Sequence, residues 1–255
     1  IESGLRTGDK WRPFPEEMFR QFNDLSADIL FVPTESARQN LIEEGFRQEI
    51  IYNTGNTAID ALERASSLTT NPDYNPGEKL LEIVDSINAQ NRIPCVLTIH
   101  RRETQGPYFR EILEKLKDYA NDCRLSYIFP VHPAPWIREQ LKEFQSPYIE
   151  KLPSVSYLQF VWLMNNSKLV FSDSGGVQEE GPHLGIPVIV LRKETERPEA
   201  ISEGNNFFIS QTTPALIRKL LSQQVNKSTL YGDGEASMKI LSHLESFLDQ
   251  RNIKD

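Results

Sequence analysis

Cysteine is scarce in this sequence, which has only Cys95 and Cys123 among its 255 residues. Two cysteines, one of them inside an apolar run, make neither a disulfide framework nor the spacing of a metal site. We therefore expect a reducing, cytoplasmic environment and no metal. A glycine-rich G-x-G-x-x-G turn after a strand is also missing, so we expect no nicotinamide and no other cofactor.

Long hydrophobic runs are absent as well. No stretch of 18 apolar residues is present, which excludes an ordinary membrane-spanning helix and a membrane partner. Positive charge is in deficit, because 28 Lys and Arg face 36 Asp and Glu for a net charge of -8. That balance argues against a nucleic-acid partner but leaves room for a local cationic pocket.

The front of the sequence shows neither a signal peptide nor an initiator methionine. We expect it to be the later part of a longer protein, or a shortened form.

Short apolar segments alternate with helical ones along the chain, which predicts βαβ units and a parallel sheet. The expected strands are 29–34, 50–56, 94–99, 126–131, 148–152, 168–172 and 187–192. The polar segment 66–79 contains two prolines and a glycine and is the expected linker. We expect residues 1–65 to be the end of a first domain and 66–234 to be a second, nucleotide-binding domain. Residues 235–255 are expected to form a closing helix that returns to the first domain through an apolar stripe at Met238, Leu241, Leu244, Phe247 and Leu248.

Polar groups follow four of the expected strands directly. His100-Arg101-Arg102-Glu103 follow the first of these strands, His132-Pro133 the second, Ser172–Gly176 the third and Lys193–Pro198 the fourth. Ligands bind beyond the carboxyl ends of the strands in such sheets, so we expect these loops to line one site.

The stretch SDSGGVQEE (172–180) predicts an anion site, since it ends a strand and begins a helix across Gly175 and Gly176. Glu180 lies one helical turn, roughly 6 Å, further along the axis, where its carboxylate suits a ribose diol. The phosphate charge would be met by the helix dipole and by His100, Arg101 or Arg197. The alternative is that Asp173 or Ser174 only caps the helix.

The motifs together resemble those of the non-hydrolysing UDP-N-acetylglucosamine 2-epimerases, in order and spacing over most of the chain. They are ESGLRTGDKWRPFPEE (2–17), PTESARQNL (33–41), TGNTAIDAL (54–62), TIHRRE (98–103), FPVHPAP (129–135), the run from Phe160 to Arg192, and ETERPEA (194–200). The resemblance implies a GT-B-like α/β fold with two Rossmann-like domains. Here the C-terminal domain is intact, whereas only the tail of the N-terminal domain is present.

The resemblance also implies roles for individual residues. Glu2 and Glu16 match carboxylates implicated in acid/base chemistry, and His100 matches the histidine at the nucleotide-diphosphate end. The UDP contacts would be Arg101, Phe160, Ser174, Gly175, Gly176, Glu180 and Arg197, with Phe160 near the uracil. His132 matches a histidine of a second, activating UDP-sugar site in bacterial members. A homodimer is implied as well.

The implied reaction inverts C2 of UDP-N-acetylglucosamine to give UDP-N-acetylmannosamine, by elimination and re-addition of UDP. A further catalytic aspartate would precede Ile1, so we expect weak or no catalysis from these 255 residues alone. The alternatives are a hydrolysing relative, a GT-B glycosyltransferase and a non-catalytic UDP-sugar-binding remnant; the GLRTG and PFPEE segments argue against the transferase.

Overall fold

The computed structural model describes residues 1–142, 144–223 and 225–252, which fold into two units. Unit 1 comprises Ile1–Glu63, Glu194–Glu199 and Thr229–Asp255, and unit 2 comprises Arg64–Lys193 and Ala200–Ser228. The border at Glu63 and Arg64 lies inside helix α3 (Thr57–Thr69), ahead of the loop that was expected to be the linker. No helix in the described residues is long and apolar enough to cross a membrane.

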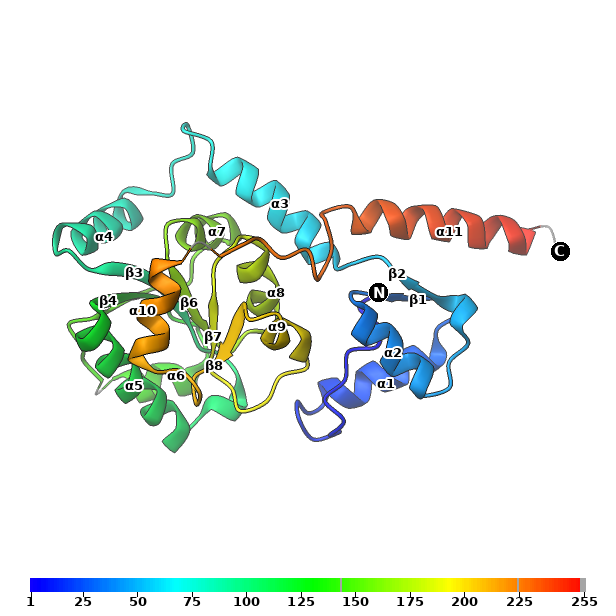
Figure 1. Cartoon of the computed structure of the whole chain (residues 1–255), viewed down its shortest axis with the longest axis horizontal. Helices are drawn as coiled ribbons and strands as arrows, with labels where there is room; N and C mark the ends of the chain where they lie inside the picture. The colour runs from blue at the N-terminus through cyan, green and yellow to red at the C-terminus, as the bar shows by residue number, and fades with distance from the viewer. Residues whose placement is uncertain (143, 224, 253–255) are drawn as a thin grey trace. The chain divides into compact units, whose positions relative to one another are not determined.

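Unit 2 is built on a six-stranded parallel sheet with the order β5-β4-β3-β6-β7-β8 (Figure 1). Its strands are β3 (Ile93–Thr98), β4 (Leu125–Pro130), β5 (Ile149–Leu152), β6 (Leu169–Ser172), β7 (Val188–Val190) and β8 (Asn206–Phe208). The chain winds outward from β3 to β5, returns to β6 and winds the other way to β8. The strand order therefore reverses between β3 and β6, and ligands bind beyond the strand ends at such a switch point.

Helices cover the sheet of unit 2. They are α4 (Glu78–Ala89), η2 (Arg102–Thr104), α5 (Pro107–Cys123), α6 (Pro135–Leu141), α7 (Tyr157–Asn165), α8 (Gly175–His183) and α10 (Pro214–Ser222), with α9 (Pro198–Ser202) at the border of the units. Phe109 of α5 belongs to one buried core with Phe129 and Phe171 of the sheet. Helix α8 lies against β7 so closely that a Cβ at Gly181 would come within 2.4 Å of Val188 Cγ2.

Strands β3 and β6 end side by side. Thr98 pairs with Ser172 in the strand register, and their hydroxyl oxygens are 2.7 Å apart. The loops that follow these two residues, His100–Thr104 and Asp173–Gly175, therefore start from neighbouring positions.

Unit 1 contains the parallel pair β1 (Leu30–Val32) and β2 (Ile51–Asn53). Its helices are α1 (Glu16–Ser26), α2 (Glu35–Glu43), η1 (Gln48–Ile50), the start of α3, and α11 (Ala236–Asn252). A small core of Leu5, Leu30, Val32, Ala37, Leu41 and Ile51 holds the strands to α2. The Asp60 carboxylate accepts the backbone N–H groups of Ala236 and Ser237, at 3.0 and 2.7 Å, and so caps α11.

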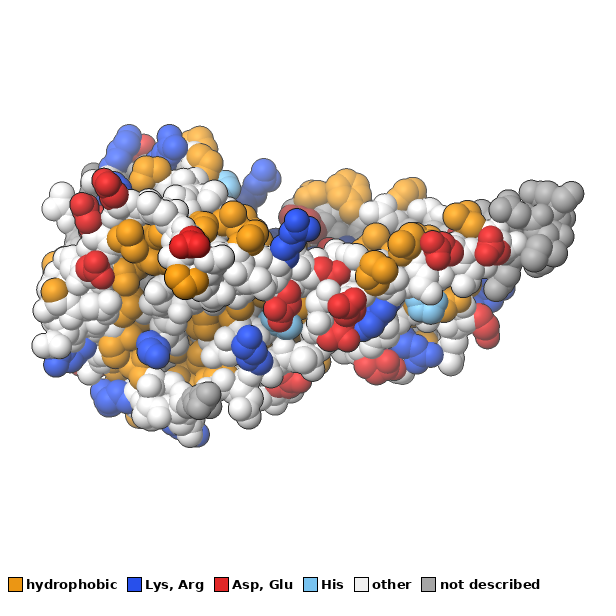
Figure 2. Space-filling model, turned by 90° about the horizontal axis from the view of Figure 1, so that it is seen from above, with side chains coloured by type: hydrophobic (Ala, Val, Ile, Leu, Met, Phe, Trp, Pro, Cys, Tyr) orange, Lys and Arg blue, Asp and Glu red, His pale blue; other side chains and the backbone are white. Residues whose placement is uncertain are grey.

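Helix α11 packs on the β1–β2 pair by a face that includes only part of the expected stripe, since Leu244 and Phe247 are half-buried. Ile240 is buried and the His243 ring lies 4.1 Å from that of Tyr52, whereas Met238, Leu241 and Leu248 are exposed. Figure 2 shows hydrophobic side chains at the surface along this helix. Positions 236, 240, 243 and 247 follow helical spacing, so the contact face is rotated from the stripe of larger apolar residues.

Candidate functional site

Asp173 is the centre of the switch point in unit 2. Its carboxylate is fully buried, and it accepts the backbone N–H groups of His100 and Arg101 at 2.9–3.0 Å and the Thr104 hydroxyl at 2.9 Å. Oδ1 also lies 3.2 Å from Nδ1 of His100. Asp173 therefore fixes the loop after β3 to the end of β6.

The His100 imidazole lies among positive charges. Burial lowers the pKa of His100 and is the largest effect. The charge of Asp173 raises this pKa, and the charges of Arg101, His132 and Arg192 lower it. The net change is downward. The imidazole is held largely neutral in the free protein, close to groups that favour a bound anion.

The basic residues around His100 come from three loops. Arg101 lies in the loop after β3, His132 in the loop after β4 and Arg192 in the loop after β7. Arg192, after β7, is buried and pairs with Glu103 at 2.5 Å. The His132 ring, after β4, lies 5.8 Å from the ring of His100, and its Nδ1 accepts the N–H of Ala134. These side chains bring basic groups from two further loops to His100.

The N-terminus of α8 lies directly after Asp173. Ser174 is the N-cap residue, but its side chain does not cap the helix, and Gly175 and Gly176 form the first turn. Nothing lies within 4 Å of the position a Cβ would take at Gly176. Helix N–H groups without a side-chain cap, next to open space, are suited to an anion.

Glu180 lies one turn further along α8. It is 8% exposed, and its Oε1 accepts a hydrogen bond of 2.8 Å from the Tyr157 hydroxyl. Burial raises the pKa of Glu180, and the bond from Tyr157 lowers it. Phe160 is half-buried one turn after Tyr157 on α7, so the two rings share a helix face.

In unit 1, Glu2 begins a sharp turn. It has a φ of 64°, a left-handed conformation that few residues other than glycine adopt. Gly4 follows with a φ of 78°, and a Cβ there would lie 2.2 Å from the Ala37 carbonyl oxygen. The N–H of Gly4 is held by Asp24, which also pairs with Arg6 at 2.8 Å.

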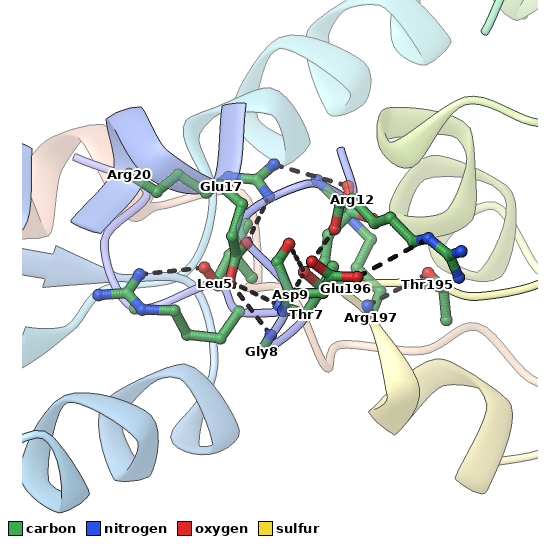
Figure 3. A network of polar contacts seen from close by, with 12 residues as sticks. Leu5, Thr7, Gly8, Asp9, Arg12, Glu17, Arg20, Thr195, Glu196 and Arg197 are labelled. Carbon is green, nitrogen blue, oxygen red and sulfur yellow. Dashed lines mark hydrogen bonds and ion pairs between the residues drawn. The ribbon is translucent and has the colours of Figure 1, made fainter. Parts of the chain in front are cut away.

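A chain of ion pairs links Glu2 to α1, and Figure 3 labels its members Arg197, Glu196, Arg20 and Glu17. Arg197, which is buried, reaches Glu2 at 3.4 Å and Glu196 at 2.6 Å. Arg20 lies between Glu196, at 3.5 Å, and Glu17, at 3.7 Å.

Of the adjacent acids that begin α1, Glu17 is the buried one. Its Oε1 accepts the N–H groups of Thr7 and Gly8, at 3.0 and 3.2 Å, and so shapes the loop before α1. Glu16 is exposed. Glu17 therefore has a structural part, whereas Glu16 is accessible to a ligand.

The structure thus gathers the candidate residues in two groups. Unit 2 holds His100, Arg101, His132, Phe160, Ser174, Gly175, Gly176 and Glu180, and unit 1 holds Glu2, Glu16 and Arg197. Reasoning from the sequence missed Tyr157, Thr104 and Arg192 and considered Asp173 only as a cap. Each of these residues contacts a partner that is 23 to 89 positions away in the sequence, so no local pattern indicates the contact.

A sequence model described as UDP-N-acetylglucosamine 2-epimerase matches residues 1–245. The chain belongs to this family. The family predicted from the motifs is thereby confirmed.

Relatives of known name support the same family. The chain is 38% identical over 260 residues to the UDP-N-acetylglucosamine 2-epimerase of Salmonella typhimurium, covering 97% of this chain and 68% of that protein. It is 35% identical to the Bacillus subtilis UDP-N-acetylglucosamine 2-epimerase, with 96% and 64% covered.

Solved structures of the epimerase family share the fold. The Neisseria meningitidis enzyme, solved with UDP-GlcNAc bound, superposes with a TM-score of 0.83 at 31% identity and covers 96% of this chain and 69% of its own. The S. aureus MnaA–UDP structure gives 0.86 at 33% identity, with 98% and 67% covered. The predicted GT-B-like α/β fold with Rossmann-like parallel sheets is confirmed.

Proposed function

We propose that this protein is a UDP-N-acetylglucosamine 2-epimerase of the non-hydrolysing kind, which interconverts UDP-N-acetylglucosamine and UDP-N-acetylmannosamine. The observation that carries the proposal is the switch point of unit 2, where Asp173 holds the His100 loop beside the bare N-terminus of α8. This geometry brings a cationic loop and helix N–H groups together, which is what a diphosphate requires.

The diphosphate, the ribose and the uracil of UDP would all bind to unit 2. The diphosphate would accept the N–H groups of Gly175 and Gly176 and the hydroxyl of Ser174, and would meet His100 and Arg101. The ribose hydroxyls would donate to Glu180, and the uracil would lie against Phe160. Relatives solved with UDP-GlcNAc or UDP support a ligand of this class.

Inversion at C2 needs a base and an acid, with cationic groups to stabilise departing UDP. We assign acid/base work to Glu2 and Glu16, which are exposed carboxylates on one loop and the helix that follows it. Elimination breaks the C1–O bond as a base takes the C2 proton. Re-addition of UDP to C1 follows once a proton reaches C2 from the opposite face.

Arg197 would aid this step from unit 1. Its guanidinium reaches Glu2 at 3.4 Å, and its second partner, Glu196, at 2.6 Å, fixes the guanidinium in place. Its assignment to a phosphate of the substrate remains part of the proposal. The second UDP-sugar site at His132 also remains a proposal.

The test is incubation of the protein with UDP-N-acetylglucosamine in D2O, followed by proton NMR. Slow epimerisation with deuterium at C2 is the expected result, in line with the weak catalysis expected from these 255 residues. Release of free N-acetylmannosamine and UDP would favour the hydrolysing reaction instead, and UDP binding without turnover would favour a non-catalytic UDP-sugar binder. A homodimer, which the family implies, would show a mass near twice 29.3 kDa by light scattering.

A further inference from the structure

Tyr157 is a polar contact of Glu180 that the proposed function leaves unassigned. It is the first residue of α7, its side chain is 43% exposed, and its hydroxyl donates to Glu180 Oε1 at 2.8 Å. Glu180 is only 8% exposed, whereas Tyr157 is exposed. Tyr157 therefore lies where solvent or a ligand would reach the Glu180 carboxylate.

The start of α7 is held firmly enough to fix this contact. Ser156 and Gln159 form a capping box, in which Ser156 Oγ accepts the N–H of Gln159 and Gln159 Oε1 accepts the N–H of Ser156. The Gln159 amide also donates to the Pro76 carbonyl oxygen at 2.8 Å. Tyr157 therefore projects from an anchored backbone, so its hydroxyl defines a fixed position for Glu180.

The contact also determines what Glu180 has left to offer. A glutamate has three rotatable side-chain bonds, and a hydrogen bond to one oxygen removes most of their freedom. A carboxylate has about four acceptor positions on two oxygens, so the bond from Tyr157 leaves Oε2 and a second position on Oε1 free for a diol.

We propose that Tyr157 is a positioning residue that holds Glu180 where it reads the ribose hydroxyls. It thereby gives this protein its preference for ribonucleotides over 2′-deoxyribonucleotides. The inference rests on the proposed assignment of Glu180 to the ribose and adds to it the residue that sets the selectivity.

The experiment measures the dissociation constants of UDP and 2′-deoxy-UDP by isothermal titration calorimetry. The unsubstituted chain is compared with Tyr157→Phe, Glu180→Gln and the double variant. Tyr148→Phe is the matched control, because Tyr148 precedes the edge strand β5, at the amino end of the parallel strands, where it stacks on Arg92.

The unsubstituted chain should prefer UDP by about tenfold, as expected for one hydrogen bond to a charged acceptor. Tyr157→Phe should lower that preference to roughly threefold, Glu180→Gln to about twofold or less, and Tyr148→Phe should leave it unchanged. In the Glu180→Gln background, Tyr157→Phe should have no further effect, since Tyr157 acts only through Glu180. A general loss of fold would weaken both nucleotides equally and leave their ratio unaltered.

The outcomes separate the two hypotheses. If Glu180→Gln leaves the preference intact, the ribose assignment fails, and the inference fails with it. If Glu180→Gln removes the preference while Tyr157→Phe does not change it, the assignment stands and the role of Tyr157 is overturned. An additive effect in the double variant would also overturn it, because Tyr157 would then contact the ribose directly.

Discussion

Asp173 holds His100 by its backbone and by its ring. Both carboxylate oxygens lie 3.0 Å from the His100 amide nitrogen, and Oδ1 lies 3.2 Å from Nδ1. The two residues are 73 positions apart and meet because β3 and β6 are neighbours in the sheet. One buried carboxylate thus gives the switch point its shape and holds the imidazole beside Asp173.

Asp173→Asn tests this arrangement, because it keeps the side-chain volume and removes the charge. We expect the free energy of unfolding to fall by about 2–3 kcal/mol and UDP to bind about tenfold more weakly. Urea denaturation and calorimetry measure the two quantities. Thr104→Val is the control and should cost about 1 kcal/mol, since it removes only one donor. Unchanged stability and affinity in Asp173→Asn would contradict the role given to this carboxylate.

His100 should take up a proton when UDP binds. Its pKa is lowered in the free protein by burial and by nearby cations, and a diphosphate beside it would raise that pKa. The pKa of His100 is then higher in the complex with UDP than in the free protein. UDP affinity should therefore rise as the pH falls from above the higher value toward the lower one. Calorimetry in buffers of different ionisation enthalpy reports the uptake. Uptake that persists in His100→Gln would assign the proton to the phosphate instead.

Glu180 should be a residue that costs stability for function. Burial raises the pKa of Glu180, so the folded state favours the protonated side chain. The ionised side chain therefore lowers the free energy of unfolding, and this loss grows as the pH rises from the unfolded-state pKa to the folded-state pKa. Glu180→Gln should therefore melt at a higher temperature than the unsubstituted chain above neutral pH while binding UDP more weakly. A lower melting temperature for Glu180→Gln under those conditions would show that the carboxylate stabilises the fold.

Arg197 and Glu2 should differ in their effect on stability although they are paired. Arg197→Met leaves Glu196 buried beside a weaker set of cations, so we expect a loss of about 3 kcal/mol. Glu2→Gln should change stability by less than about 1 kcal/mol, because the Glu2 side chain is 47% exposed. Equal losses in urea denaturation would mean that the Glu2 pair, rather than the Glu196 pair, holds Arg197.

The sequence alone predicted much of unit 2, for physical reasons that are local. Runs such as CVLT and KLVF are continuously apolar because both faces of a parallel strand are buried, and this marks them as strands. The polar residues after them indicated the rim of the site. Helix α4 and strand β8 were not predicted. The first lies beside the polar linker segment, and the second has only three residues, NFF.

What the sequence did not reveal depends on tertiary neighbours. Nothing in PFPEE distinguishes Glu16 from Glu17, yet the fold buries Glu17 against Thr7 and Gly8 and leaves Glu16 exposed. Arg197 meets Glu2 across 195 positions, and Tyr157 meets Glu180 across 23. Partners of this kind follow from strand order and helix placement, which local patterns do not specify.

The most direct test of the account is a titration of the ¹⁵N-labelled chain with UDP, followed by amide NMR. Saturable binding is expected, with the largest shifts at His100, Arg101 and Ser174–Gly176 and smaller ones at Tyr157 and Glu180. An absence of saturable binding, or shifts confined to the amino end of β5 around Tyr148, would contradict a UDP site at the β3–β6 switch point.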